Sequence, residues 1–262
     1  MFQNHLLQLL ALTAMEPPPS MTADAVRDEK VKVLQSVRWF TQESIPKSAV
    51  RAQYSAGKNK GQSVPGYRDE PDVARDSKTP TYAAVRFYID NWRWQGVPFY
   101  LRSGKRMAKR HSEIAVQFHA PPHLMFGGEK QHGELKPNTL VMRVQPNEGV
   151  SLNFEVKVPG AAVAMTQHVE VAPVDMEFSY AEAFGETAAP AYETLLLDVM
   201  IGEMTLFTRS DEVEAAWKLI DPLISYWEKH TPKRMPEYPA GSWGPREADE
   251  LIEECGAEWR EP

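Results

Sequence analysis

Six short runs of β-branched and aromatic residues, separated by Gly, Pro and Asn, limit the fold of this chain more than any other feature. Such runs are typical of β-strands joined by turns. Their connections favour antiparallel pairing, because a parallel pair needs a crossover of about a dozen residues or more. The predicted strands are Tyr82–Asp90, Pro98–Arg102, Glu113–His119, Thr139–Gln145, Val150–Lys157 and Val169–Val171.

Helical patterns lie on both sides of this strand region, which predicts an α+β fold with a large, mostly antiparallel β-sheet and flanking helices. We interpret residues 1–262 as one domain. A polar segment from Ser55 to Pro80 is predicted to be a functional or mobile loop, because it is too long for a tight turn. The predicted helices are Phe2–Met15, Thr22–Arg38, Ala191–Gly202, Asp211–Lys229 and Arg246–Cys255.

The charge of the chain is unevenly distributed. The formal net charge is -7, which argues against a general nucleic-acid binder, since such proteins present a basic surface. Residues 245–262 form an acidic tail with seven acids and two bases. The one dense basic stretch, residues 102–110, holds five bases and no acid.

The single cysteine, Cys255, excludes an intrachain disulfide and fits a reducing compartment, so we expect a cytoplasmic protein. The apolar N-terminal run has no Lys or Arg before it and is interrupted by polar residues, which argues against a signal peptide. No stretch approaches the roughly 20 apolar residues of a membrane span. We therefore expect no membrane partner.

No motif for a bound cofactor or metal stands out. The chain lacks the GxGxxG turn that lets backbone amides reach a dinucleotide pyrophosphate, and GKNKG at residues 57–61 does not have P-loop spacing. His119 and His123 are four residues apart, but Pro121 and Pro122 exclude the helix that would pair them on a metal. We predict no metal site.

Two features carry possible chemistry, and each has an ordinary structural alternative. Lys105 and Arg110 follow a strand and a glycine, so they could converge on a dianion such as a sugar phosphate. The alternative is a solvated basic loop. His5 lies at the start of an apolar helix, where it is either a base or a packed residue. Composition and spacing leave both alternatives open.

A resemblance to a known family becomes specific in several motifs. QNHLLQ, VRDEKVKVL, FYIDNWRWQGVPFYLRSGKR, RVQPNEG, YETLLLDV and GPREADEL occur in that order along the chain. With these motifs the chain resembles the C-terminal domain of the glucose-6-phosphate dehydrogenase family. The resemblance implies a large antiparallel sheet that forms the contact of a homodimer or higher oligomer. It also implies an NADP-dependent oxidoreductase that oxidises glucose 6-phosphate to 6-phosphogluconolactone in the oxidative pentose phosphate pathway.

The resemblance further implies roles for individual residues. His5, in the QNH motif, would be the catalytic general base, a task that suits an imidazole near neutral pH. Lys105 and Arg110, in the RSGK-like motif and five positions later, would bind the substrate. Gln145, in RVQPNE, matches a family position near the substrate pocket.

The resemblance has one large gap. The family's N-terminal Rossmann domain has no counterpart in these residues, so we assign no residue to the cofactor and expect the isolated chain to be inactive. Two hypotheses follow. The chain is the C-terminal part of the enzyme, or it is a non-catalytic dimerisation or regulatory module derived from it.

Overall fold

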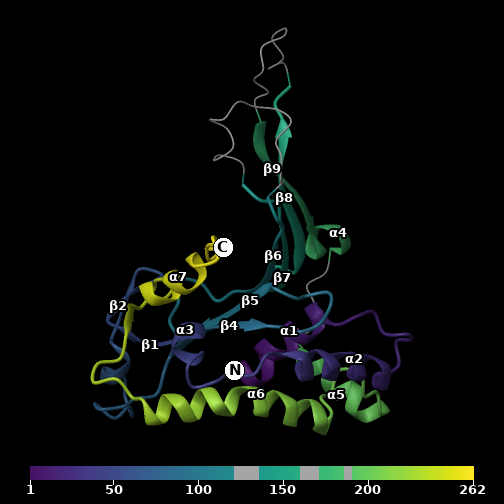
Figure 1. Cartoon of the computed structure of the whole chain (residues 1–262). Helices are drawn as coiled ribbons and strands as arrows, with labels where there is room; N and C mark the ends of the chain where they lie inside the picture. The colour runs from purple at the N-terminus through teal and green to yellow at the C-terminus, as the bar shows by residue number, and fades with distance from the viewer. Residues whose placement is uncertain (121–135, 160–170, 186–190) are drawn as a thin grey trace. The chain divides into compact units, whose positions relative to one another are not determined.

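The computed structural model describes residues 1–120, 136–159, 171–185 and 191–262. The chain forms two compact units, Met1–Lys109 with Pro190–Glu261, and Arg110–Ala189 (Figure 1). In chain order, the first unit contains η1 (Phe2–Leu6), α1 (Leu7–Ala14), α2 (Ala23–Ser36), α3 (Ile45–Ser48), β1 (Ala49–Ser55), β2 (Gly57–Asn59), β3 (Gln62–Val64), η2 (Tyr67–Asp69), β4 (Tyr82–Tyr88), β5 (Pro98–Gly104), α5 (Ala191–Ile201), α6 (Ser210–Lys229), β10 (Glu237–Pro239) and α7 (Arg246–Glu253).

The second unit is formed mainly by strands. They are β6 (Ser112–Gln117), β7 (Thr139–Gln145), β8 (Gly149–Lys157) and β9 (Val171–Ser179), followed by the short helix α4 (Tyr180–Phe184). Residues 169 and 170 of the last predicted strand lie outside the described residues. Helices flank mainly antiparallel sheets, so the predicted α+β class is confirmed.

The first unit has a four-stranded sheet in the order β10–β1–β4–β5. β4 pairs antiparallel with both neighbours, with Tyr82 opposite Gly104 and Tyr88 opposite Pro98 on β5. β10 pairs parallel with β1, placing Tyr238 opposite Tyr54. Neither β1 nor β10 is among the strands predicted above. β10 has three residues, too few to show a periodic pattern.

Strand β4 is buried on both faces, which makes it the centre of the first unit. Val85 and Phe87 point into an apolar cluster formed with α1, α2 and α6. Tyr82 and Ala84, on the opposite face, belong to a second cluster with β1, β10 and α7. Because alternate residues of a strand point to opposite faces, one strand joins the two clusters.

The predicted loop from Ser55 to Pro80 is partly regular. It contains the antiparallel hairpin β2–β3 and the 3₁₀ turn η2. Lys60 and Gly61 connect the hairpin with φ of 49° and 80°. Two residues with positive φ match the right-handed twist of the strands that they join, which explains why such a short hairpin forms here.

The acidic tail is folded. Leu251 of α7 is buried, and the indole N–H of Trp259 donates to the carbonyl of Ala248 at 2.8 Å. The Trp259 ring meets Tyr100 of β5 edge to face, with centroids 6.0 Å apart. Cys255 is exposed and forms no disulfide. The acidic side chains therefore lie on a segment that packs against the first unit through its apolar residues.

The sheet of the second unit, in the order β6–β7–β8–β9, is antiparallel throughout. Residues directly opposite each other share a face, and one face is apolar across all four strands. The apolar face contains Ile114, Val116, Leu140, Met142, Val150, Leu152, Phe154, Val174, Met176 and Phe178.

Among the helices of the described residues, none is long and apolar enough to cross a membrane.

Candidate active site

His5 lies on a π-helical turn, η1, that precedes α1. The Leu6 amide donates to the Met1 carbonyl, five residues back, at 3.3 Å. Wide turns of this kind occur often at functional sites. The His5 side chain is exposed and makes no hydrogen bond or ion pair within the described ranges. Its ring nitrogens are therefore open to a bound molecule.

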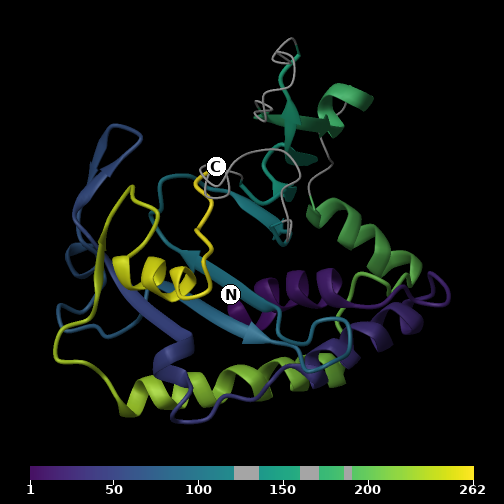
Figure 2. The ribbon, with the colours of Figure 1, turned by 45° about the horizontal axis from the view of Figure 1, so that its top comes forward.

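Helix α1 determines where this turn lies. Leu7, Leu10 and Ala14 are buried in the helical cluster, and the indole N–H of Trp94 donates to the Ala14 carbonyl at 2.9 Å. Trp94 lies in the connection from β4 to β5, so the last turn of α1 lies at the end of the strand pair where β4 ends. Figures 1 and 2 show α1 running alongside β4 in the same general direction. The turn with His5 directly precedes the first residue of α1, so the packing of this helix fixes where the turn lies.

Lys105 directly follows the end of β5, and its backbone is held on both sides. Its amide donates to the Thr81 carbonyl at 2.8 Å, and its own carbonyl accepts from the Tyr238 hydroxyl at 2.6 Å. Tyr238 is fully buried, and burial raises the pKa of its phenol to about 12. The hydroxyl therefore stays protonated at neutral pH and remains a donor.

Gly104 is required by close packing. A Cβ at this position would lie 2.7 Å from a ring carbon of Tyr82 and 2.8 Å from the Met107 sulfur. A larger residue immediately before Lys105 would force the Tyr82 ring or the Met107 side chain to move. The glycine thus lets the strand end against Tyr82.

The turn after Lys105 is held by two distant segments. The Gly241 amide donates to the Arg106 carbonyl at 2.7 Å, and the Ala108 amide donates to the Ser242 carbonyl at 3.0 Å. The Asn59 side chain, from β2, donates to the Met107 carbonyl at 2.8 Å. The predicted basic loop is therefore a fixed turn in its backbone.

Two of the five bases in residues 102–110 have structural contacts. Arg102 donates to the Trp243 carbonyl at 3.1 Å, and its guanidinium lies 4.6 Å above the Trp259 ring. Arg106 forms an ion pair with Glu70 at 3.0 Å. The side chains of the other three are exposed and, among the described residues, have no hydrogen-bond or ion-pair partner; they are Lys105, Lys109 and Arg110.

Arg110 and Gln145 lie in the second unit, whereas His5 and Lys105 lie in the first. Gln145 ends β7 opposite Ser112 of β6 and is exposed. Arg143, two residues earlier on β7, donates to the Asn147 carbonyl at 3.2 Å and pairs with Glu177 at 2.5 Å. His5 and Lys105 thus belong to the first unit, and Arg110 and Gln145 belong to the second.

Sequence reasoning missed the residues that hold the Lys105 turn. Thr81 lies in the same stretch of sequence as Lys105, but Tyr238, 157 residues beyond Thr81, belongs to no motif near Lys105. No group of three or more His, Cys, Asp or Glu side chains that could bind a metal occurs in the described part of the chain. His123, of the pair considered above, lies outside the described residues.

Comparison with known proteins gives a consistent result. Residues 1–260 match the family described as "Glucose-6-phosphate dehydrogenase, C-terminal domain". The chain is 47% identical over 261 residues to glucose-6-phosphate 1-dehydrogenase of Chlamydia pneumoniae, covering 99% of this chain and 49% of that protein. The corresponding protein of Rhizobium meliloti is 48% identical, with 100% and 51% covered.

Two solved structures are also similar. Glucose-6-phosphate 1-dehydrogenase from Mycobacterium avium has a TM-score of 0.78 at 33% identity, covering 100% of this chain and 50% of that one. A glucose-6-phosphate dehydrogenase in complex with its substrate glucose-6-phosphate has a TM-score of 0.83 at 35% identity, covering 99% and 50%. The chain thus spans about half the length of these relatives.

Proposed function

This chain belongs to the glucose-6-phosphate dehydrogenase family by its C-terminal domain, and from this we propose that it supplies the general base and part of the sugar-phosphate site of that oxidoreductase. The substrate would be glucose 6-phosphate and the product 6-phosphogluconolactone. The observation that carries the proposal is the exposed, unpaired Lys105 ammonium on a turn fixed by Thr81 and Tyr238. We also propose a cytoplasmic location, because the single cysteine of the chain fits a reducing compartment.

In the proposed reaction, His5 takes the proton of the C1 hydroxyl through an imidazole nitrogen. The hydrogen at C1 would leave with its electron pair as hydride to an acceptor of the nicotinamide class, and the C1–O bond would become the carbonyl of the lactone. The exposed ring of His5 suits this task, since no described residue competes for its nitrogens.

Lys105 and Arg110 would bind anionic or hydroxyl groups of the substrate, and Gln145 would border the same pocket. A lysine ammonium on a fixed backbone loses less freedom on binding than one on a flexible loop. Support for Lys105 comes from the contacts of its backbone. Arg110 and Gln145 are carried over from the family motif, and both are exposed.

The family implies NADP as the hydride acceptor, but the residues of this chain do not form a recognisable dinucleotide site. The sequence has no glycine-rich dinucleotide turn, and we assign no described residue to this cofactor.

Replacing Lys105 by Met is expected to weaken binding of glucose 6-phosphate by about tenfold to a hundredfold. The substitution removes a hydrogen bond between charged groups, worth about 1.5–3 kcal/mol, and keeps the length of the side chain. Isothermal titration of the 262-residue chain with glucose 6-phosphate measures the change.

Lys218→Met is the matched control, because Lys218 is an exposed lysine on α6 of the same unit. It should leave the dissociation constant unchanged. Equal affinity of the Lys105→Met protein and the unmodified chain would show that Lys105 does not bind the substrate.

A specific observation also favours self-association through the sheet of the second unit. Val174, Met176 and Phe178 of β9 are 41%, 63% and 41% exposed and share one face. Exposed apolar faces of this kind mark contacts between proteins. We propose that the chain forms a homodimer or higher oligomer through this sheet. On its own, such contact would suit the alternative of a non-catalytic dimerisation or regulatory module.

Met176→Asp is expected to convert the oligomer to monomer. A carboxylate on the apolar face would have to be buried without a partner, at a cost of several kcal/mol. Analytical ultracentrifugation at micromolar concentration measures the mass. The control is Glu155→Lys, a charge change on the opposite, polar face of β8. A Met176→Asp protein that sediments like the unmodified oligomer would place the contact elsewhere.

A further inference from the structure

Three helices of the first unit meet at a buried ionic cluster. Glu212 of α6 is fully buried, and its Oε1 accepts from the Lys30 ammonium of α2 at 2.7 Å. The same oxygen accepts from the Gln8 side-chain amide of α1. The other carboxylate oxygen, Oε2, is shielded from water and has no hydrogen-bond partner in the described part of the chain.

Packing alone does not require charges at this place. Replacing a buried ion pair by apolar residues of similar volume is often neutral for stability, so the cluster is weak support for a purely stabilising role. Buried polar contacts can instead specify one arrangement of helices, because any other arrangement leaves a charge without partners.

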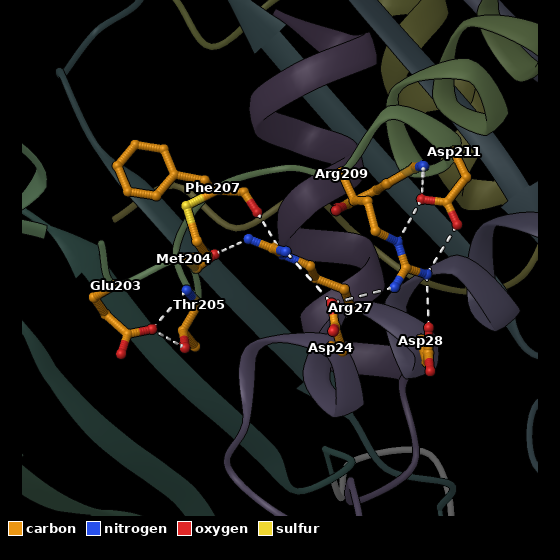
Figure 3. A network of polar contacts seen from close by, with 10 residues as sticks. Asp24, Arg27, Asp28, Glu203, Met204, Thr205, Phe207, Arg209 and Asp211 are labelled. Carbon is orange, nitrogen blue, oxygen red and sulfur yellow. Dashed lines mark hydrogen bonds and ion pairs between the residues drawn. The ribbon is translucent and has the colours of Figure 1, made fainter. Parts of the chain in front are cut away.

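The arrangement of α2 and α6 is already fixed by a separate network (Figure 3). Arg27 of α2 donates to the Phe207 carbonyl at 3.0 Å and also to the Met204 carbonyl. Arg209, just before α6, pairs with Asp28 of α2 at 2.6 Å. These contacts hold the segment that leads into α6 against α2 without the help of Glu212.

Helix α1 takes no part in that network. Leu7, Leu10 and Ala11 contact their neighbours through apolar surface, which resists sliding less than a hydrogen bond does. Among the described residues, α1 forms hydrogen bonds with distant side chains at its two ends. The Ala14 carbonyl accepts from the Trp94 indole N–H, and the Gln8 side-chain amide donates to the Glu212 carboxylate.

Gln8 lies three residues after His5, so its hydrogen bond is the nearest polar tie to the turn that carries the proposed base. We infer that Glu212 and Lys30 are positioning residues, which act through Gln8 to fix the π-helical turn of His5. This inference rests on the proposed function only for the role of His5. The mechanical tie itself is independent of substrate.

The test compares three variants of the 262-residue chain. Gln8→Met removes the amide, and the double variant Lys30→Met with Glu212→Leu replaces the ion pair by apolar residues. Lys32→Met is the control, since its side chain is 66% exposed on the same helix as Lys30. Amide hydrogen exchange of residues 6–11, the urea midpoint and the His5 ring cross-peak in NMR are measured for each.

In Gln8→Met, amides 6–11 should exchange at least tenfold faster relative to amides of α2 and β4, and the His5 cross-peak should broaden or split. The double variant should keep a midpoint near that of the unmodified chain and still show both local changes. Lys32→Met should show neither.

The inference is overturned if amides 6–11 and the His5 signal follow the midpoint in every variant, because the cluster would then act on stability alone. If the local changes occur but substitution of His5 leaves catalysis intact, the tie stands and the assignment of the base fails. The two failures are therefore distinguishable.

Discussion

The 262-residue chain alone, supplied with glucose 6-phosphate and NADP, is expected to form NADPH far more slowly than a typical enzyme turns over, at a kcat of about 10 s⁻¹. Hydride transfer requires the nicotinamide to be held against C1, and such positioning is worth about 7–11 kcal/mol of the barrier. The chain has no dinucleotide-binding motif to provide it. Absorbance of NADPH measures the rate.

The comparison is the same chain joined to the nucleotide-binding half of a relative, in which turnover should appear. If the isolated chain forms no NADPH, a separate measurement of glucose 6-phosphate binding shows whether the chain is folded. Turnover by the isolated chain near the ordinary value would contradict this expectation and would require a cofactor site that its motifs do not reveal.

His5→Asn, in the joined enzyme, is expected to lower kcat by about 10²–10⁴-fold with little change in KM for glucose 6-phosphate. An amide keeps part of the shape of imidazole but cannot accept the proton of the C1 hydroxyl, and general base catalysis contributes a factor of this size. Because His5 is exposed, the substitution should not unfold the chain. Steady-state kinetics separates the two constants.

His230→Asn serves as the control, since His230 is an exposed histidine at the end of α6 that stacks on Tyr226. It should leave kcat unchanged. If His5→Asn retains full turnover, another group takes the proton, and the motif-based assignment is wrong.

Much of the fold could be predicted from local patterns. The strands from Tyr82 and from Thr139, and the helices from Ala191 and Arg246, begin at the predicted residues. These elements are long enough to show a hydrophobic period. β1 and β10 were not predicted, and β10 exists by pairing with β1, whose residues are about 180 positions away. No local pattern records such a pairing.

The candidate site divides in the same way. The motifs point to His5, Lys105, Arg110 and Gln145, and their roles stay predictions. The structure adds what surrounds them. It places His5 on a π-helical turn and shows that Arg102 and Arg106, also in the basic stretch, serve structural contacts. Charge spacing alone does not separate these arginines from Lys105.

Local sequence patterns were enough to predict the α+β class, most helices and strands, the family and the candidate residues, because propensity and motif are properties of neighbouring positions. The groups that hold the candidate residues in place become visible in the folded chain. Tyr238 reaches the Lys105 carbonyl from 133 positions away, and Gln8 and Glu212 meet across 204. Such contacts arise when packing brings distant segments together and every buried donor or acceptor needs a partner.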